Sequence, residues 1–258
     1  MTYAFKTETF EFEYIESSID STVLWENHCH ARFEMLAVLE GNISIVLEGR
    51  NYRLTEGEGI LVPPLAYHTV ITNRKGTYRR ITAMFDPEAI PSVLRPRLLN
   101  RDTVIISSSP QIRDLKKICK EKESDFYAPL ANSLMIQILY NNAQTELTDS
   151  EAEEDSFLKK ILSYIEEHLC EKIMLDDLAR HCSRSKSSVC HLFEEKMKVS
   201  TKQYILQKKM AYAAGLIRDG QNPTSVAVQV GYENYSDFYR MYQKHFGTSP
   251  TKNQARPT

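Results

Sequence analysis

Short runs of alternating apolar and polar residues fill the first 107 positions of the chain, and this period of two is typical of β-strands. Turns rich in Gly, Pro and Asn separate the runs, and Glu40-Gly41-Asn42 between two of them predicts a hairpin. The predicted strands are residues 10–15, 33–39, 43–47, 51–54, 59–62, 68–72 and 80–85. Many short strands at such intervals predict a barrel or jelly roll.

From Pro110 onward the apolar residues recur at helical spacing instead. Residues 111–122 and 126–145 are predicted helices whose apolar stripes have no evident barrel face left to cover. The acidic run TDSEAEED at 148–155 contains one apolar residue and fits an exposed linker. The expected parts are therefore a barrel at 1–107, a helical connector at 108–147, a linker at 148–156 and a helical domain at 157–258.

After the linker the sequence predicts six helices, at 157–169, 175–181, 186–197, 200–218, 223–230 and 235–246. A short helix, a tight turn and a second helix occur twice among them, which is the layout of a helix-turn-helix. Ser185 and Asn234 are expected to cap the second helix of each unit, with Asp237 as the capping-box partner of Asn234. The long helix between the units spans roughly 28 Å at 1.5 Å per residue, close to one turn of B-DNA.

Charge is distributed unevenly between the two predicted halves of the chain. Residues 1–156 contain 16 Lys and Arg against 24 Asp and Glu, a formal charge of −8, whereas residues 157–258 contain 16 against 10, or +6. A basic helical domain is compatible with nucleic-acid binding although the whole chain carries −2. The five scattered cysteines, the lack of a secretory leader and the lack of a long apolar run indicate a cytoplasmic protein without membrane contact.

The C-terminal 100 residues resemble the DNA-binding domain of the AraC/XylS family of transcription regulators. The resemblance rests on LDDLARHCSRSKSSVCHLF, on YILQKKMAYAAGLI and above all on SVAVQVGYENYSDFYRMYQKHFGTSP. It implies a ligand-responsive bacterial regulator with two helix-turn-helix units. Three departures weaken the positive charge or the turn of the first unit: Lys198 replaces a Gly, Glu194 and Glu195 replace residues that are often basic, and His191 replaces a common Arg.

Position on the two second helices predicts which side chains meet DNA. Base edges are expected to meet Ser187, Cys190 and His191 in the first unit, and Tyr235, Ser236, Tyr239 and Arg240 in the second. Phosphates are expected to meet Lys186, Lys202 and Lys244. Arg240 can read guanine through a bidentate contact. Phe193, Phe238, Tyr242 and Phe246 are interpreted as core.

The barrel contains HCHARFEMLAVLEG at 28–41 and a later Gly57-x5-Pro63 followed by His68, which resembles the cupin pattern. The second half departs from that pattern, because Leu65 stands where a Gly is usual. His28, His30, Glu34 and His68 are expected to converge inside the barrel, and three imidazoles with one carboxylate suit Fe, Mn, Ni or Zn. A divalent metal therefore stays an open alternative, although no cofactor is expected to be obligatory.

Two other interpretations of the same residues stay open: a pocket for an organic effector, or polar groups that only satisfy one another. The candidate pocket residues are Trp25, His30, Glu34, Arg53 and His68. The sequence thus favours an α+β protein: a cupin-like jelly-roll sensor joined to an all-α DNA-binding domain with two helix-turn-helix units. It would bind double-stranded DNA, respond to a small effector such as a sugar or small acid, and have no enzymatic activity.

Two alternatives to this regulator remain, a cupin metalloenzyme fused to a DNA-binding domain and a DNA-binding protein whose barrel is filled by side chains. Analogy with the family further suggests a homodimer, with a contact along Leu130, Leu134, Ile138 and Leu139. Packing of the same stripe against the outside of the barrel is the competing interpretation.

Overall fold

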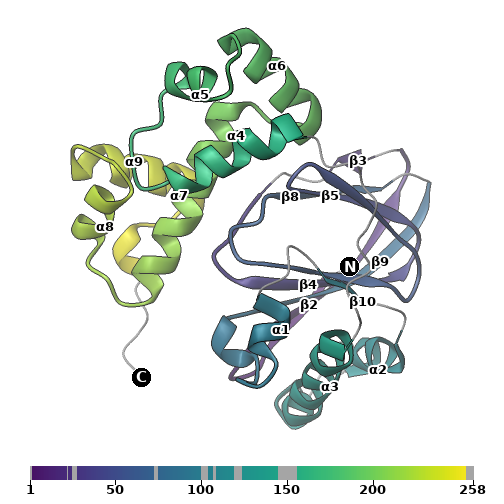
Figure 1. Cartoon of the computed structure of the whole chain (residues 1–258). Coiled ribbons are helices and arrows are strands. Elements are labelled where there is room, and N and C mark those ends of the chain that lie inside the picture. Colours follow the sequence, from purple (N-terminus) through teal and green to yellow (C-terminus); the bar gives the residue numbers. More distant parts are fainter. Residues whose placement is uncertain are drawn as a thin grey trace. The chain divides into compact units, whose positions relative to one another are not determined.

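The computed structural model describes residues 2–21, 23–24, 28–72, 75–99, 104–106, 109–118, 124–144 and 156–253. The chain divides into two compact units, one formed by residues 1–26 and 32–150 and the other by 27–31 and 151–258. Figure 1 labels most of the helices and strands. Residues 145–155 lie outside the described residues, so the predicted linker and the predicted domain bounds stay predictions.

In its described residues the first unit contains two antiparallel sheets and four helices, one of them a 3₁₀ turn. Its elements are β1 (Thr2–Lys6), β2 (Phe10–Ile19), β3 (Val23–Leu24), β4 (Phe33–Glu40), β5 (Ile43–Leu47), β6 (Arg50–Leu54), β7 (Gly59–Val62), β8 (His68–Thr72), β9 (Gly76–Phe85), η1 (Pro87–Ala89), α1 (Arg95–Leu99), β10 (Val104–Ile106), α2 (Pro110–Ile118) and α3 (Ser124–Gln144). One sheet has the strand order β1-β2-β9-β4-β7-β10, and the other β3-β8-β5-β6. All seven predicted strands are present, and the predicted jelly-roll-like architecture is confirmed.

The two sheets enclose an apolar core to which alternate residues of several strands contribute. Leu36 and Val38 of β4 pack in it with Ile43 and Ile45 of β5 and with Val70 of β8. Because successive side chains of a strand point to opposite faces, Glu34 of β4 also points between the sheets.

The other face of the six-stranded sheet is buried as well, under helices. Phe33 and Met35 of β4 share a core with Ile112 and Leu115 of α2 and with Met135 of α3. Helix α2 contacts β4, α3 contacts β1 and β10, and Figure 1 shows α2 and α3 side by side next to β10. Helices α2 and α3 therefore do have a barrel face to cover, contrary to the sequence-based interpretation.

Two further predictions about the first unit are wrong, one about a turn and one about a dimer contact. The turn at Gly41 does not close a hairpin, because β4 pairs with β7 and β9 whereas β5 pairs with β6 and β8. The chain crosses there from one sheet to the other. The expected dimer stripe is largely core: Leu134, Ile138 and Leu139 are 6%, 1% and 1% exposed against the sheet, and only Leu130 is exposed.

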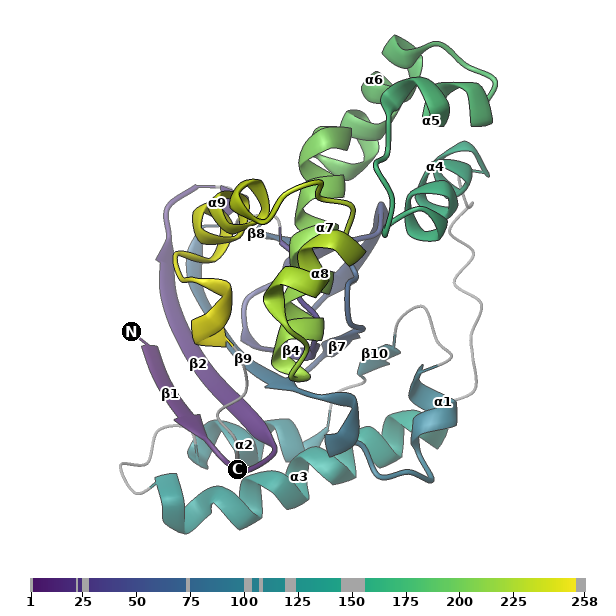
Figure 2. The same cartoon turned by 90° about the vertical axis from the view of Figure 1, so that its left-hand side faces the viewer.

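The second unit contains six α-helices and a final 3₁₀ turn in its described part. They are α4 (Ser156–Glu167), α5 (Leu175–His181), α6 (Lys186–Met197), α7 (Thr201–Arg218), α8 (Pro223–Gln229), α9 (Tyr235–Phe246) and η2 (Pro250–Asn253). Figure 2 shows α7 as the long helix that connects α5 and α6 to α8 and α9. The prediction of two helix-turn-helix units is confirmed by these elements. None of the described helices combines the length and the apolar character that a membrane span requires.

Side-chain caps define where α6, α7, α8 and α9 of the second unit begin. The hydroxyl of Ser185 accepts from the backbone N–H of Ser188, and Ser200 does the same for Gln203. The side chain of Asn222 accepts from Thr224, and that of Asn234 from Asp237. Each cap satisfies a backbone donor that the first helical turn leaves unpaired, which explains why these polar residues precede apolar stretches.

The residue that directly follows each second helix adopts a left-handed conformation, and it is a different residue type in the two helix-turn-helix units. Gly247 ends α9 with φ of 67°, where an added Cβ would have no neighbour within 4 Å. Lys198 ends α6 with φ of 58°. A side chain costs about 1–2 kcal/mol in this conformation because Cβ approaches the following carbonyl. The structure thus explains why Gly is usual at the position of Lys198.

We predict that Lys198→Gly stabilises the protein by about 1 kcal/mol, since the backbone strain is relieved and the more flexible unfolded chain offsets part of the gain. The mirror change, Gly247→Ala, should destabilise it by about the same amount, because no packing at Gly247 accompanies the change. Urea unfolding of the second unit measures both. Equal stability of the parent and Lys198→Gly proteins would contradict the role assigned to the left-handed residue.

Candidate functional site

The second helices of the two helix-turn-helix units each have one buried and one exposed face. Val189 and Phe193 of α6 and Phe238 and Tyr242 of α9 are buried, as the core interpretation predicts. Phe246 is partly buried. The opposite faces remain accessible, which is the arrangement of a helix that enters a groove.

All seven expected base contacts lie on α6 or α9 outside the buried core. The exposed ones are Ser187, His191, Ser236 and Arg240, and the partly buried ones are Cys190, Tyr235 and Tyr239. The rings of Tyr235 and Tyr239 lie 6.1 Å apart, and burial raises the pKa of the Tyr235 phenol. These two tyrosines therefore pack against each other, and part of each side chain is buried while the rest stays accessible at the surface.

The three lysines expected at phosphates are exposed. Lys186 forms an ion pair of 2.6 Å with Asp176 of α5, so its ammonium is held beside the start of α6. Lys202 lies in the first turn of α7, and Lys244 lies in the last turn of α9.

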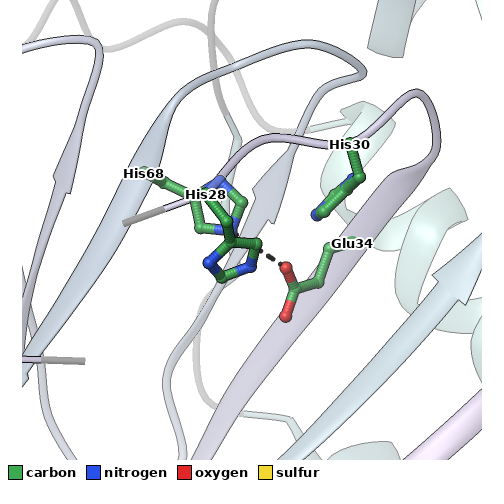
Figure 3. A group of neighbouring side chains, drawn as sticks. All are labelled: His28, His30, Glu34 and His68. Atoms are coloured by element: carbon green, nitrogen blue, oxygen red, sulfur yellow. Dashed lines mark hydrogen bonds and ion pairs between the residues drawn. The ribbon is translucent and has the colours of Figure 1, made fainter. Parts of the chain in front are cut away.

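Figure 3 shows His28, His30, Glu34 and His68 gathered with their polar atoms toward one another. One ligand atom from each lies within 4.8 Å of every other. Glu34 lies near the start of β4, His68 begins β8, and both are buried. His28 and His30 lie on the connection that precedes β4. The structure thus brings together the four residues that the sequence singled out.

His68 is held in a defined orientation by its two ring nitrogens. Nδ1 lies 2.9 Å from the carbonyl oxygen of Ala66 and Nε2 lies 3.1 Å from Oε2 of Glu34. A carbonyl oxygen only accepts, so Nδ1 carries a proton and donates it. Nε2 and a carboxylate can then face each other only if a proton or a cation lies between them. The pair therefore requires an imidazolium, a protonated carboxyl or a bound metal ion.

The electrostatics of the pair favour the protonated form of the His68 imidazole. Burial by itself lowers the pKa of the His68 imidazole, but the hydrogen bond to Glu34 and the carboxylate charge outweigh it, and the net pKa is raised. An imidazolium is stabilised at this place by the same carboxylate that would help to bind a metal cation.

A divalent metal fits these residues with small shifts. Metal–ligand bonds of about 2.1 Å place neighbouring ligands about 3 Å apart and opposite ligands about 4.2 Å apart. The 3.1 Å between His68 and Glu34 matches neighbouring ligands, and separations of up to 4.8 Å require movements of about 0.5 Å. The Ala66 carbonyl already supplies the hydrogen bond that orients a metal-binding imidazole.

The turn before His68 explains one departure from the cupin pattern. Leu65 adopts a left-handed conformation with φ of 63°. This is the conformation that Gly adopts without strain, so the chain keeps the turn of the pattern with a less suitable residue.

Two other residues were expected to line the pocket. The prediction for Arg53 is wrong, because its side chain is exposed, and Trp25 lies outside the described residues. Arg53 is exposed on β6 and pairs with Ser44, whereas His68 pairs with Leu47, three positions along β5. An odd separation along a strand places Arg53 and His68 on opposite faces of the sheet.

Sequence analysis missed the residues that β9 places between the sheets. Tyr78, Arg80 and Thr82 alternate along β9, and Thr82 pairs with Leu36, which points into the core. Burial raises the pKa of Tyr78, and the positive charge of Arg80 partly opposes this rise. The alternation of the run GTYRRITAMF contains this information, but it does not say which face is inward.

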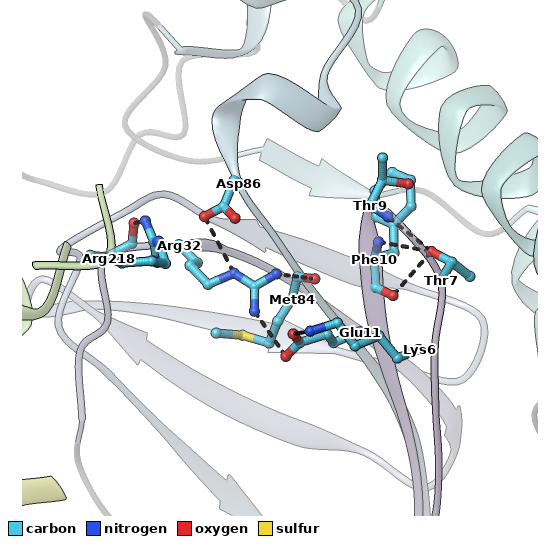
Figure 4. A network of polar contacts seen from close by, with 10 residues as sticks. Lys6, Thr7, Thr9, Phe10, Glu11, Arg32, Met84, Asp86 and Arg218 are labelled. Carbon is cyan, nitrogen blue, oxygen red and sulfur yellow. Dashed lines mark hydrogen bonds and ion pairs between the residues drawn. The ribbon is translucent and has the colours of Figure 1, made fainter. Parts of the chain in front are cut away.

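Arg32 fixes the start of β4, two residues before Glu34 (Figure 4). Its guanidinium donates to the Met84 carbonyl at 3.2 Å and forms ion pairs with Glu11 at 2.9 Å and Asp86 at 3.4 Å. These contacts join β2, β4 and the end of β9. They therefore restrict the position from which Glu34 reaches His68.

Comparison with known proteins agrees with this architecture. A model of AraC-like ligand binding domains matches residues 10–139, about half of the chain, and a model of helix-turn-helix domains matches residues 178–256. The chain belongs to the AraC family of DNA-binding transcription regulators with a ligand-binding domain.

Individual relatives are distant. The transcriptional regulator YdeC of Bacillus subtilis is 20% identical over 243 residues, which cover 86% of this chain and 84% of YdeC. The regulator YdiP of Escherichia coli is 31% identical over 98 residues, 38% of this chain, and the chain spans only 32% of it. Among solved structures, ToxT from Vibrio cholerae is similar with a TM-score of 0.42 and 13% identity, covering 95% of this chain and 97% of ToxT.

We predict that protein treated with a chelator remains folded and keeps its affinity for DNA, since Glu34, His68 and Ala66 already satisfy one another. Thermal unfolding and DNA titration before and after treatment measure this. Stoichiometric metal in protein purified without chelator, lost in His30→Ala and accompanied by a lower melting temperature, would contradict the prediction, because a ligand bound at a hundredfold excess over Kd adds about 2.7 kcal/mol.

Proposed function

We propose that the first unit binds a small polar effector between its two sheets and that this binding changes the affinity of the second unit for an operator. The observation that carries the proposal is a set of buried polar side chains within a largely apolar interior. Glu34, His68 and Thr82 are all buried there. Buried polar groups cost stability unless they are paired, so an interior built only for packing would favour apolar residues.

The chemistry of these residues supports an effector rich in oxygen. Glu34 accepts hydrogen bonds, and His68 and Arg80 donate them, which suits hydroxyl and carboxylate groups. A sugar or a small acid fits this set. We propose no enzymatic activity for the chain and a cytoplasmic location.

A cupin metalloenzyme fused to a DNA-binding domain is the second candidate, and the four converging ligand atoms favour it. A metal held by His28, His30, Glu34 and His68 would supply Lewis-acid chemistry. The chain itself would orient the metal through His68, which Ala66 fixes. Sustained turnover of a small substrate by purified protein, abolished in Glu34→Gln, would support this candidate over the regulator.

For the second unit we propose that α6 and α9 enter successive major-groove faces of one duplex. The 18 residues of α7 separate them by about 27 Å at 1.5 Å per residue, near the roughly 34 Å repeat of B-DNA. The formal charge of +6 over residues 157–258 supports attraction to phosphates. Glu194 and Glu195 are exposed on α6, so α9 should contribute more of the affinity.

We also propose a homodimer, through a face of α3 different from the buried stripe. Phe126, Leu130 and Tyr140 are 75%, 49% and 52% exposed, and their spacing places them on one side of the helix. Large exposed apolar residues gathered on one face are typical of association surfaces. A pair of DNA-binding units would then reach a pair of half-sites.

The expected result for DNA is binding by the fragment that begins at Phe157, with strong salt dependence. Each phosphate neutralised contributes about −0.9 to the slope of log K against log salt, so replacing Lys186, Lys202 and Lys244 with Ala should make the slope about 3 units less negative. Titration of labelled duplex at several salt concentrations measures this. Binding that does not respond to salt, or no binding to DNA from beside the gene, would contradict the proposal.

For the dimer, Leu130→Asp should yield monomers, because burial of a carboxylate at the contact is costly. Sedimentation equilibrium of the full chain measures the change. The control is Val93→Asp, since Val93 is 76% exposed and lies outside α3. Unchanged association of the Leu130→Asp protein would exclude this face of α3.

A further inference from the structure

The carboxylate of Asp237 is anchored at the start of α9 by both ends of one asparagine side chain. The backbone N–H of Asp237 donates to Oδ1 of Asn234 at 2.9 Å, and Nδ2 of Asn234 donates to Oδ2 of Asp237 at 2.8 Å. The other carboxylate oxygen, Oδ1, accepts from Nη2 of Arg240, one turn further along the helix. Asp237 therefore links the helix cap to the residue expected to read a guanine.

These contacts leave Arg240 restrained yet accessible. Its side chain is 76% exposed, and a guanidinium has five N–H donors, of which the recorded contact with Asp237 engages Nη2. An unrestrained arginine loses rotamer freedom when it contacts a base. A guanidinium already held by Asp237 loses less, so more of its hydrogen-bond energy is available for recognition.

The pair also changes the balance between base and phosphate contacts. A guanine edge presents neutral acceptors, O6 and N7, whose recognition depends on the position of the N–H groups. A phosphate attracts net positive charge, and the carboxylate of Asp237 cancels the positive charge of Arg240. The hydrogen bond from Asn234, followed by that from Arg240, lowers the pKa of Asp237, so this cancellation persists at neutral pH.

We propose that Asp237 is a specificity-determining positioning residue, which holds Arg240 for a guanine edge and reduces the attraction of α9 for phosphates. The proposal rests on DNA binding by α9 and deepens it, since it assigns discrimination to a carboxylate that would otherwise only weaken binding. Asp237 does not need to touch DNA to act in this way.

The chain contains a matched control pair on a helix that is not expected to enter the groove. Asp177 and Arg180 of α5 form the same type of ion pair, three residues apart, at 3.1 Å. Their side chains are 41% and 78% exposed, against 47% and 76% for Asp237 and Arg240. Asp177→Asn therefore removes the same charge from a similar pair without affecting the recognition helix.

The experiment uses the full chain and an operator selected from random duplexes, with each base pair then replaced in turn and with unrelated DNA as reference. Asp237→Asn should bind unrelated DNA more tightly and lose about two- to tenfold discrimination at one base pair, the pair at which Arg240→Ala also loses discrimination. The double variant should lose no more there than Arg240→Ala alone, because both changes remove one interaction.

The controls separate this role from a structural one. Asp177→Asn should bind unrelated DNA more tightly but keep its discrimination at every base pair. Asp237→Gln also removes the charge but keeps an amide that can accept a hydrogen bond at the helix start. It should show the same change in discrimination as Asp237→Asn, even if the shorter side chain of Asn destabilises the cap. Equal losses on all sequences with a lower melting temperature, unchanged discrimination, or additive losses in the double variant would each overturn the proposal. Failure of the unaltered chain to bind any DNA would instead contradict the proposed function.

Discussion

Burial of the six-stranded sheet on both faces is the constraint on which the first unit depends. Because side chains alternate along β4, Phe33 and Met35 pack under α2 and α3, whereas Glu34 and Leu36 point between the sheets. A shift of one residue in the pairing of β4 would exchange these sets and place a carboxylate in the helical core. Such an exchange would disrupt the packing of apolar side chains and bury a carboxylate among them, which costs free energy. This cost fixes Glu34 opposite His68, so the geometry of the polar site follows from packing on the other side of the sheet.

Local patterns predicted much of the fold, and the failures share one physical reason. Caps such as Ser185 and Asn234 depend on neighbouring residues, so the helices that follow them could be predicted within one or two positions. Partner choice is not local: nothing near Gly41 shows that β4 and β5 belong to different sheets. The error at Arg53 has the same origin, because alternation separates two faces without saying which one is inward. The apolar stripe of α3 likewise did not reveal the sheet that buries it.

The convergence of the four polar residues could be predicted because their spacing combines two short-range rules. His28 and His30 are two residues apart, and Glu34 follows within the same segment, so the chain itself keeps them close. Only His68 comes from a distant strand, and the turn at Leu65 delivers it. Arg80 and Thr82 have no such motif, and they become visible only through the pairing of β9 with β4.

Leu65 in the first unit and Lys198 in the second have the same backbone conformation. Both adopt left-handed conformations where family patterns use Gly; Leu65 lies in the turn before β8, and Lys198 directly follows α6. The chain keeps each turn despite the strain, which indicates that the geometry of the turn matters more than its cost of about 1–2 kcal/mol. The second helix-turn-helix ends at Gly247 without this cost, and its α9 also lacks the exposed glutamates of α6. The second helix-turn-helix thus has both the unstrained backbone and the more favourable charge. It is also the one in which Asp237 restrains the exposed side chain of Arg240.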